Sequence, residues 1–269
     1  MIWLVQNSMF GDEFGYDCFI AAIDATGNRR IQLDYAFWEA TIDLKLTGVS
    51  PEEIMPFGTR SFVCYAKKNG WIVYWDEAFD YSALRCLGEE FINFDLEVGP
   101  LDQLKVPEDG KVFIREAAGF NIIKGKVISA YAWPEWVNGF KFSTSQEIDT
   151  GVGPRYHDWH PIDGNTHFVW APVKKILDEY RVWIIDGKVV SSSQYIKGGD
   201  IVYTNSDENW EVNTYAQKMA DRLPFKMRNY VLDVFRTDRG LKVGEVNCLH
   251  CSGWYAIDSR KVVKALATS

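Results

Sequence analysis

The sequence lacks every segment that would place it in or across a membrane. No stretch of its 269 residues approaches the roughly 18 apolar residues that a spanning helix needs. The N-terminus, MIWLVQNSMFGDEFGYD, lacks the basic start, the long apolar middle and the small-residue cleavage site of a signal peptide. Internal repeats and low-complexity tracts are absent as well. We therefore expect a cytoplasmic protein without a membrane partner.

Positive charge, histidine and cysteine are also in short supply. Lys and Arg number 29 against 37 Asp and Glu, a net charge of −8. A global electrostatic grip on nucleic acid is therefore disfavoured, and only a local basic groove stays open. With four histidines, the sequence contains no recognisable Ser/His/Asp or Cys/His arrangement. The five cysteines, an odd number scattered along an acidic chain, indicate reduced cytosolic thiols.

What is present is typical of a folded globular chain: 47% hydrophobic and 25% charged residues. The length allows one large domain or two smaller lobes. Over the first hundred residues strands alternate with helices, which indicates an α/β lobe. We expect strands at 1–5 and 71–75 and helices at 59–69 and 81–87, and the segment 51–58 has turn residues at both ends. The Pro- and Gly-containing stretch EVGPLDQLKVPEDG (97–110) marks a boundary, so we expect domains over 1–98 and 99–269.

The second domain is richer in strands and is expected to be an α+β lobe with antiparallel sheets. Strands are indicated at 111–114 and 126–132. Asp186-Gly187 is a strong two-residue hairpin signal between strands 179–185 and 188–195. A further hairpin joins strands 230–236 and 241–247. Apolar residues at helical spacing predict a helix over 210–223, and 255–267 is expected to form a closing helix.

The last hairpin carries the most informative residues. If Asp238-Arg239-Gly240 is a three-residue loop with Gly240 in the left-handed conformation, Asp233 lies opposite Glu245, and Asn247 follows on the same face. Two facing carboxylates repel each other, and a divalent cation between them removes the penalty. Carboxylate and amide oxygens suit Mg²⁺ better than zinc. A two-residue loop would put Asp233 and Glu245 on opposite faces, and a solvated polar hairpin face is the alternative.

Two other segments contain candidate anion-binding groups. In the middle hairpin, an uninterrupted register places Arg181 opposite Ser192 and Glu179 opposite Gln194. Taken alone, this polar group is better explained by a salt bridge on an exposed sheet surface. Arg115 and Lys124 flank a glycine-containing loop between strands, where cations can hold phosphates. Basic loop residues are more often simply solvated.

Together and in this order, the three segments resemble the ATP-grasp superfamily over about the last 160 residues. The frame VLDVFRTDRGLKVGEVN is similar to that family's metal-binding strand pair, which implies Asp233, Glu245 and Asn247 as metal ligands. The segment DEYRVWIIDGKVV resembles the family's strand in which an acidic residue binds the ribose and an Arg the terminal phosphate. Glu179 and Arg181 stand at those positions.

The rest of the resemblance concerns the nucleotide. Trp170 and Ala171 fall where the family's hinge offers backbone groups to adenine. Arg115 stands where the family usually has a phosphate-binding Lys, and with Lys124 close behind it the chain resembles a divergent, phage-associated subgroup. The glycine-rich phosphate loop is reduced to AAGFNIIKG. The tail SGWYAID also looks like that subgroup.

The resemblance implies an ATP- and Mg²⁺-dependent carboxylate–amine ligase that forms an amide through an acylphosphate. It implies Arg181 and Lys124 as catalytic residues, small-molecule or peptide carboxylates and amines as partners, and a homodimer, because relatives often are dimers. A non-catalytic nucleotide-binding interaction protein is one alternative. A nucleic-acid end-processing ligase, suggested by Arg222, Lys226 and Arg228, is another.

Two further clusters have plainer interpretations. Cys248-x-x-Cys251, with His250 between, could be a redox pair or half a zinc site, but no second ligand pair stands at zinc spacing. Free thiols are therefore favoured. His157 and His160 lie between prolines in an expected loop and are kept as candidates for substrate contact.

Overall fold

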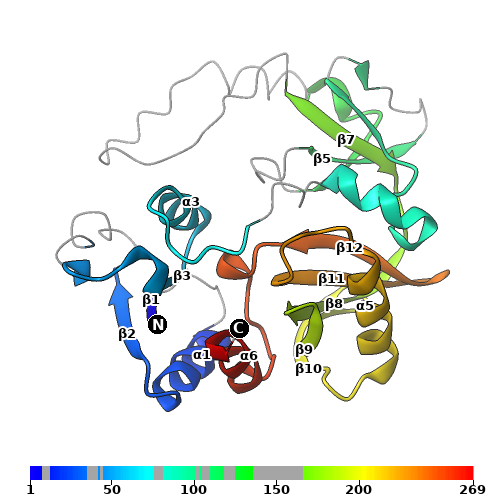
Figure 1. Ribbon diagram of the computed structural model, residues 1–269. Coiled ribbons are helices and arrows are strands. Elements are labelled where there is room, and N and C mark those ends of the chain that lie inside the picture. Colours follow the sequence, from blue (N-terminus) through cyan, green and yellow to red (C-terminus); the bar gives the residue numbers. More distant parts are fainter. Residues whose placement is uncertain are drawn as a thin grey trace. The chain divides into compact units, whose positions relative to one another are not determined.

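The computed structural model describes residues 1–7, 13–34, 42, 45–75, 81–100, 103–104, 110–117, 125–135 and 166–268. The chain divides into two compact units, Met1–Phe79 with Ile176–Ser269 and Asp80–Lys175 (Figure 1). The first unit therefore joins both ends of the sequence, and the second is a single inserted stretch. These units do not follow the segments 1–98 and 99–269, which stay a prediction about sequence domains.

The N-terminal part of the first unit is a small parallel sheet with helices on both faces. Its order is β2-β1-β3, with strands β1 (Ile2–Gln6), β2 (Arg29–Leu33) and β3 (Ile54–Phe57). Helix α1 (Glu13–Ala25) connects β1 to β2, and α3 (Arg60–Lys68) follows β3. The predicted α/β architecture, the first strand and the helix at 59–69 are confirmed.

One expectation in this region is wrong. Residues 71–75 form no strand: Ile72 makes one backbone bond to Ile54, and the segment pairs with no further strand among the described residues. Between the turn residues at the two ends of 51–58, the 3₁₀ helix η1 (Pro51–Glu53) leads directly into β3. The proline in β3, Pro56, hid this strand, since proline is normally depleted inside sheets.

The C-terminal part of the first unit is a five-stranded antiparallel sheet of order β10-β9-β8-β11-β12. Its strands are β8 (Ile176–Ile185), β9 (Lys188–Lys197), β10 (Asp200–Asn205), β11 (Tyr230–Thr237) and β12 (Gly240–Asn247). Helix α5 (Trp210–Arg222) follows β10, and α6 (Ser259–Thr268) closes the chain (Figure 1). Both hairpins and α5 are confirmed; the closing helix begins at Ser259 rather than at 255.

The pairing of β11 with β12 depends on a bulge at Gly244. Thr237 pairs with Gly240, so the loop has two residues, not the predicted three. The register then shifts by one between Val243 and Glu245, and Asp233 pairs with Glu245 as predicted. A Cβ on Gly244 would lie 2.4 Å from the Phe235 ring, so this position needs glycine. The predicted loop was wrong, and the predicted facing pair is confirmed because the bulge compensates for it.

The middle hairpin corrects the predicted partners of Arg181 and Glu179. The turn at Asp186 (φ 50) and Gly187 (φ 73) is confirmed. Two register shifts in the hairpin, however, pair Arg181 with Ser193 and Glu179 with Ile196 rather than with Ser192 and Gln194. The even-numbered residues Tyr180, Val182 and Ile184 of β8 are buried.

One aromatic cluster packs the two sheets of the first unit together. Trp254 stacks on Phe19 of α1, with ring centroids 3.8 Å apart, and lies 4.4 Å from the ring of Trp183 on β8. Trp3 of β1 stacks on Phe57 of β3 at 5.6 Å. All of these rings belong to one buried core, so the parallel and antiparallel sheets of this unit share a hydrophobic interior.

The second unit contains a four-stranded antiparallel sheet of order β4-β7-β5-β6. Its strands are β4 (Glu97–Pro100), β5 (Lys111–Glu116), β6 (Lys126–Ser129) and β7 (His167–Pro172). A 3₁₀ helix, η2 (Tyr81–Glu90), precedes them where an α-helix was expected at 81–87. None of the helices described in either unit is long and apolar enough to cross a membrane.

We predict that Trp254→Ala lowers the free energy of unfolding by about 3–5 kcal/mol, because it removes the ring that joins the two sheets and leaves a cavity. Urea denaturation measures this change. Trp210, 78% exposed on α5, provides the matched control: Trp210→Ala should stay within about 0.5 kcal/mol of the wild type. Equal losses for the two variants would contradict the central role of Trp254.

Candidate functional site

Four predicted residues meet on one face of the antiparallel sheet. Arg181 donates to Asp233 through both arms of its fork, with Nε 2.9 Å from Oδ1 and Nη2 2.9 Å from Oδ2. Asn247 donates its side-chain amide to Asp233 Oδ2 at 3.0 Å and to Glu245 Oε1 at 3.1 Å. The adjacent strands β8, β11 and β12 thus bring together the predicted metal ligands and the predicted phosphate-binding arginine.

Burial and neighbouring negative charge raise the pKa values of two carboxyl groups on this face. Burial raises the pKa of the Asp233 carboxyl to about 6; the Arg181 guanidinium opposes the rise, and the charges of Glu245 and Glu179 add to it. Burial also raises the pKa of the Glu179 carboxyl, against a hydrogen bond from Tyr195. The charge of Glu245 therefore disfavours the ionised forms of both Asp233 and Glu179, and that of Glu179 disfavours ionised Asp233.

Two tyrosines that the sequence did not single out complete this face. The Tyr195 hydroxyl donates to Glu179 Oε2 at 2.7 Å. The Arg181 guanidinium lies 5.4 Å from the centroid of the Tyr195 ring and 4.9 Å from that of Tyr255. Tyr255 holds a positive φ of 47°, which is rare for a residue with a side chain. In the sequence, Tyr255 was noticed only as part of the tail SGWYAID, and nothing there indicated that it contacts Arg181.

The predicted nucleotide-binding residues Arg115, Trp170 and Ala171 belong to the second unit. Arg115, on β5, is 7% exposed, and its guanidinium lies 4.5 Å from the centroid of the Tyr81 ring. Trp170, on β7, pairs with both β4 and β5, whereas Ala171 pairs with β5 only. At Ala171, unlike at Trp170, the edge of β7 that faces β4 is past the end of the β4–β7 pairing. Lys124, His157 and His160 lie outside the described residues.

In the Cys-x-His-Cys segment, both ring nitrogens of the histidine are used in hydrogen bonds to the protein backbone. His250 is completely buried, its Nδ1 lies 2.6 Å from the Pro56 carbonyl oxygen, and its Nε2 accepts the Tyr74 N–H at 2.8 Å. Nδ1 therefore carries the proton, and neither nitrogen is left for a metal. Cys248 and Cys251 are free thiols, as favoured from the sequence.

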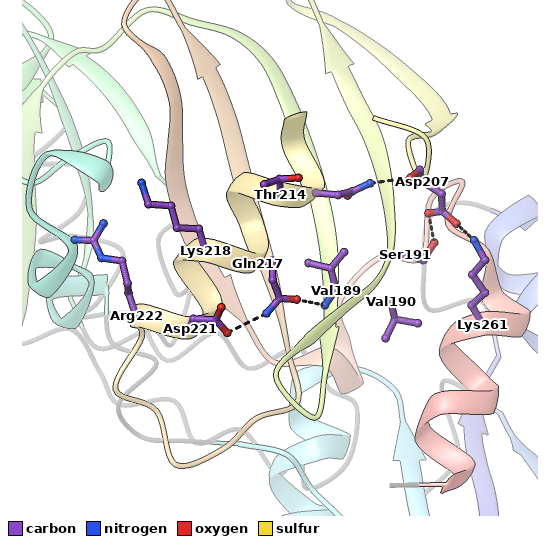
Figure 2. A pocket seen from close by; sticks show the side chains of 11 residues that line it. Val189, Val190, Ser191, Asp207, Thr214, Gln217, Lys218, Asp221, Arg222 and Lys261 are labelled. Atoms are coloured by element: carbon purple, nitrogen blue, oxygen red, sulfur yellow. Dashed lines mark hydrogen bonds and ion pairs between the residues drawn. The ribbon is translucent and has the colours of Figure 1, made fainter. Parts of the chain in front are cut away.

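A pocket of about 860 Å³ opens at the edge of β9, beside α5 and α6 (Figure 2). β10 pairs with β9 only as far as Ser193 in the described sheet. Further along β9, side chains accept backbone N–H groups that a neighbouring strand would otherwise bind. Gln217 accepts the Val189 N–H at 2.9 Å, and Asp207 accepts the Ser192 N–H at 2.8 Å. The open edge of the sheet is thereby covered.

The charges around this pocket are mixed. Lys261 pairs with Asp207, and Asp221 accepts from Gln217, as the dashed lines of Figure 2 show. Arg222, which suggested the nucleic-acid alternative, lines the pocket beside these acids. A polyanion would meet carboxylates here as well as cations, so the pocket does not favour that alternative.

The fold and the face of Arg181, Asp233, Glu245 and Asn247 define a class of proteins, the ATP-grasp enzymes. A family model for the ATP-grasp domain, R-2-K clade family 3, matches residues 109–266. The chain belongs to this family, which confirms the predicted superfamily and identifies the chain as an ATP-grasp ligase. The match begins inside the 97–110 stretch.

Solved structures of similar fold include a synthetase, a ligase and a macrocyclase. D-cycloserine synthetase DcsG matches with a TM-score of 0.56 and 12% identity, covering 99% of this chain and 98% of that one. D-alanine–D-alanine ligase from Bacillus anthracis matches with 0.52 and 12%, covering 100% and 92%. Macrocyclase MdnC, bound with precursor peptide MdnA, from Microcystis aeruginosa MRC matches with 0.54 and 11%, covering 100% of both chains. The predicted fold class is confirmed. The sequence matches no curated protein.

The carboxylate and amide oxygens of the site suit a Mg²⁺ ion that is bound partly by the protein and partly by substrate phosphates. No group of three His, Cys, Asp or Glu side chains in the described part of the chain could hold a metal ion. Asp233 and Glu245 are two carboxylates, joined by one amide, in a patch where burial and mutual charge raise the pKa of Asp233. One or two carboxylates completed by substrate phosphates is the usual coordination of Mg²⁺ in nucleotide sites.

We predict a pH dependence of stability that originates at His250. Burial lowers its pKa to about 4, while the unfolded chain titrates near 6.5. Below about pH 6.5 the unfolded state binds the additional proton, so this histidine reduces stability progressively down to about pH 4, by up to about 3 kcal/mol. Urea denaturation between pH 7.5 and 5 measures the slope, which should flatten in His250→Gln. The exposed His167 is the control, and a His167→Gln variant that flattened the slope equally would contradict the assignment.

Proposed function

We propose that the protein is an ATP-dependent carboxylate–amine ligase that forms an amide or peptide bond and releases ADP and phosphate. The observation that carries the proposal is the face on which Arg181, Asp233, Asn247 and Glu245 are linked by hydrogen bonds. It combines a phosphate-binding fork with hard oxygen ligands, in a chain of the ATP-grasp family.

The proposed reaction has two steps. A substrate carboxylate oxygen attacks the γ-phosphorus of ATP, the bond from that phosphorus to the β–γ bridging oxygen breaks, and ADP leaves. The resulting acylphosphate is attacked at its acyl carbon by an amine, the carbon–oxygen bond to phosphate breaks, and the amine loses a proton. Both steps bring anions together, so the enzyme must mainly position groups and cancel charge.

In this reaction each residue of the first unit has a distinct role. Mg²⁺ would supply charge cancellation at the β- and γ-phosphate oxygens. Asp233, Glu245 and Asn247 would hold it, with Asn247 presenting Oδ1 in place of the amide hydrogens that now link the two carboxylates. Arg181 would exchange Asp233 for the oxygens of the transferring phosphoryl group, because its fork fits phosphate as well as carboxylate. Glu179 would accept the ribose hydroxyls.

The nucleotide roles of the second unit rest on the family resemblance. Arg115 and Lys124 would hold α- and β-phosphates, with Lys124 also acting in catalysis, and Trp170 and Ala171 would offer backbone groups to adenine. One observation supports the phosphate-binding role of Arg115: its positive charge is buried and is held on strand β5. The boundary between an N-terminal domain (1–98) and the ATP-grasp domain (99–269) agrees with a family match that begins at residue 109.

The substrates proposed are small-molecule or peptide carboxylates and amines. The printed names of the similar structures support this range, since they include a D-alanine–D-alanine ligase and a macrocyclase bound with a precursor peptide. A cytoplasmic location and a homodimer remain part of the proposal, the first supported by five free thiols.

The test is ADP release that depends on a carboxylate, with hydroxylamine as a general acceptor that converts an acylphosphate into a hydroxamate. ADP and hydroxamate formed in equal amounts with one member of a carboxylate panel support the ligase. Binding of ATP and Mg²⁺, seen as a rise of roughly 5–10 °C in the unfolding midpoint, without ADP release from any carboxylate would favour the non-catalytic alternative.

We predict that Glu245→Gln reduces Mg²⁺-dependent ADP release by about 100-fold or more, because one hard ligand is lost. The unfolding midpoint without nucleotide should change little, since Glu245 is only partly buried. Glu211→Gln, on α5 away from this face, makes the same charge change and should keep full activity. Glu245 is preferred to Asp233 here, because removing one partner of a buried ion pair costs about 3–5 kcal/mol by itself.

We predict that Arg181→Lys retains nucleotide binding and loses most of kcat. A lysine keeps the charge but cannot reproduce the two-armed contact with phosphate. The thermal shift with ATP and Mg²⁺ measures binding, and ADP release measures turnover. An Arg181→Lys variant with wild-type kcat would remove Arg181 from the mechanism.

A further inference from the structure

The carboxyl ends of β1 and β3 form a position where α/β sheets commonly bind ligands. In the order β2-β1-β3, the chain leaves β1 toward β2 on one side and later returns to β3 on the other. The strand order therefore reverses between β1 and β3. Ligands of open parallel sheets bind outside the carboxyl ends of the strands at such a reversal. Here those ends are Gln6 of β1 and Phe57 of β3, which leads into α3.

The N-terminus of α3 lies at this reversal and carries only positive charge. Thr59 caps the helix by accepting the Phe62 N–H, and the nine-residue helix has no acidic residue in its first turn. Its first residue is Arg60. Its guanidinium adds positive charge at the positive end of the helix. The first-turn N–H groups, which have no acceptor within a helix, are suited to receive an anion.

The side chain of Gln6 is an independent indication of a ligand. It is 0% exposed, and its Oε1 accepts the Thr59 N–H at 2.7 Å and the Thr59 hydroxyl at 3.0 Å, which fixes the amide against the start of α3. Its Nε2 is buried and donates to nothing in the described part of the chain. An unpaired buried donor is unfavourable, and an acceptor oxygen at the helix start would remove that cost.

Gly58 lets the side chains of Gln6 and Phe62 pack closely against the start of α3. A Cβ at Gly58 would lie 2.5 Å from Gln6 Oε1 and 2.2 Å from the Phe62 ring, so no side chain fits between β3 and α3. The Gly58 N–H bonds to the His250 carbonyl at 3.0 Å. Through His250, the start of α3 is fixed to the segment that directly follows Asn247.

Cys251 connects this position to the Arg181 face. A hydrogen bond from Cys248 lowers the pKa of the Cys251 thiol, and the positive charges of Arg60 and Arg181 lower it further. The geometry agrees, because a Cβ at Gly253, two residues after Cys251, would lie 3.4 Å from Arg181 Nη1. The segment 250–253 thus runs from the start of α3, where the His250 carbonyl accepts the Gly58 N–H, to Arg181, which would bind the transferring phosphoryl group.

We propose that the N-terminus of α3, with Gly58, Thr59, Arg60 and the Gln6 side chain, binds the carboxylate of the acyl substrate. The assignment to the acyl substrate rests on the ligase function proposed above, whereas the binding of a carboxylate rests on the geometry alone. First-turn N–H groups and the Gln6 amide donate to the carboxylate oxygens, and Arg60 neutralises its charge.

The test is a titration of the full-length, ¹⁵N-labelled protein followed by amide NMR, without nucleotide. Acetate should shift the amide signals of Thr59, Arg60 and Ser61 in a saturable manner, with a dissociation constant on the order of 10 mM for so small a ligand. Methylammonium chloride at equal ionic strength should shift none of them. No saturable shift with acetate, tighter binding of inorganic phosphate than of acetate, or an equal response to methylammonium chloride would each overturn the proposal.

Two variants of α3 provide matched controls. Arg60→Gln should weaken acetate binding by about 10-fold, because a charge-assisted contact is lost. Lys67→Gln makes the same charge change in the last turn of the helix and should leave the dissociation constant unchanged. Equal effects of the two substitutions would mean that only net charge matters, which contradicts the site. Since the titration needs no turnover, a failure of the ligase assay leaves its result readable.

Discussion

The rest of the structure depends on the packing of Trp254 between Phe19 and Trp183. A parallel three-stranded sheet and an antiparallel five-stranded sheet, far apart in the sequence, share one interior because these rings meet there. Cores pack as densely as organic crystals and transmit small displacements. The carboxyl ends of β1 and β3 and the face of Arg181 therefore belong to one compact unit. In this unit His250, three residues after Asn247, is hydrogen-bonded to Pro56 of β3 and to Tyr74.

The Arg181–Asp233 pair is an expensive way to build a sheet face. Desolvating two charges often costs more than their attraction returns, and apolar residues of similar size would often be as stable. The neighbouring carboxylates of Glu179 and Glu245 add to the cost by raising the pKa of Asp233. Such a patch is expected at a functional site, where a bound cation and a phosphate complete the balance of charge.

Local sequence signals were sufficient to predict the fold class and much of the site. They were not sufficient to predict the register between strands. Asp186-Gly187 identified its hairpin because the turn chemistry is local. The pairing of Asp233 with Glu245 was anticipated through two deviations that cancelled, a shorter loop and a bulge at Gly244. The partners of Arg181 on β9 were wrong, since nothing in the residues of β9 announces a register shift.

Contacts between distant segments were beyond reach for a different reason. The bond from Tyr195 to Glu179 and the position of Tyr255 beside Arg181 depend on how separate segments pack, and residue type alone does not specify that. The strand β3 was hidden by its proline. The buried state of His250 was likewise invisible, because its partners Pro56 and Tyr74 lie 194 and 176 residues away in the sequence.

The bulge at Gly244 makes chain length, more than side-chain identity, the sensitive variable of this hairpin. If the ladder of the same chain ran on without the bulge, Asp233 would pair with Gly244, and Glu245 and Asn247 would turn to the opposite face of the sheet, although both residues would still be present. In related sequences with the same spacing from Asp to Glu, a three-residue turn without a bulge would give the same pairing as the two-residue turn with the bulge. An alignment that counts residues from Asp233 without regard to the ladder would assign the wrong pair of side chains.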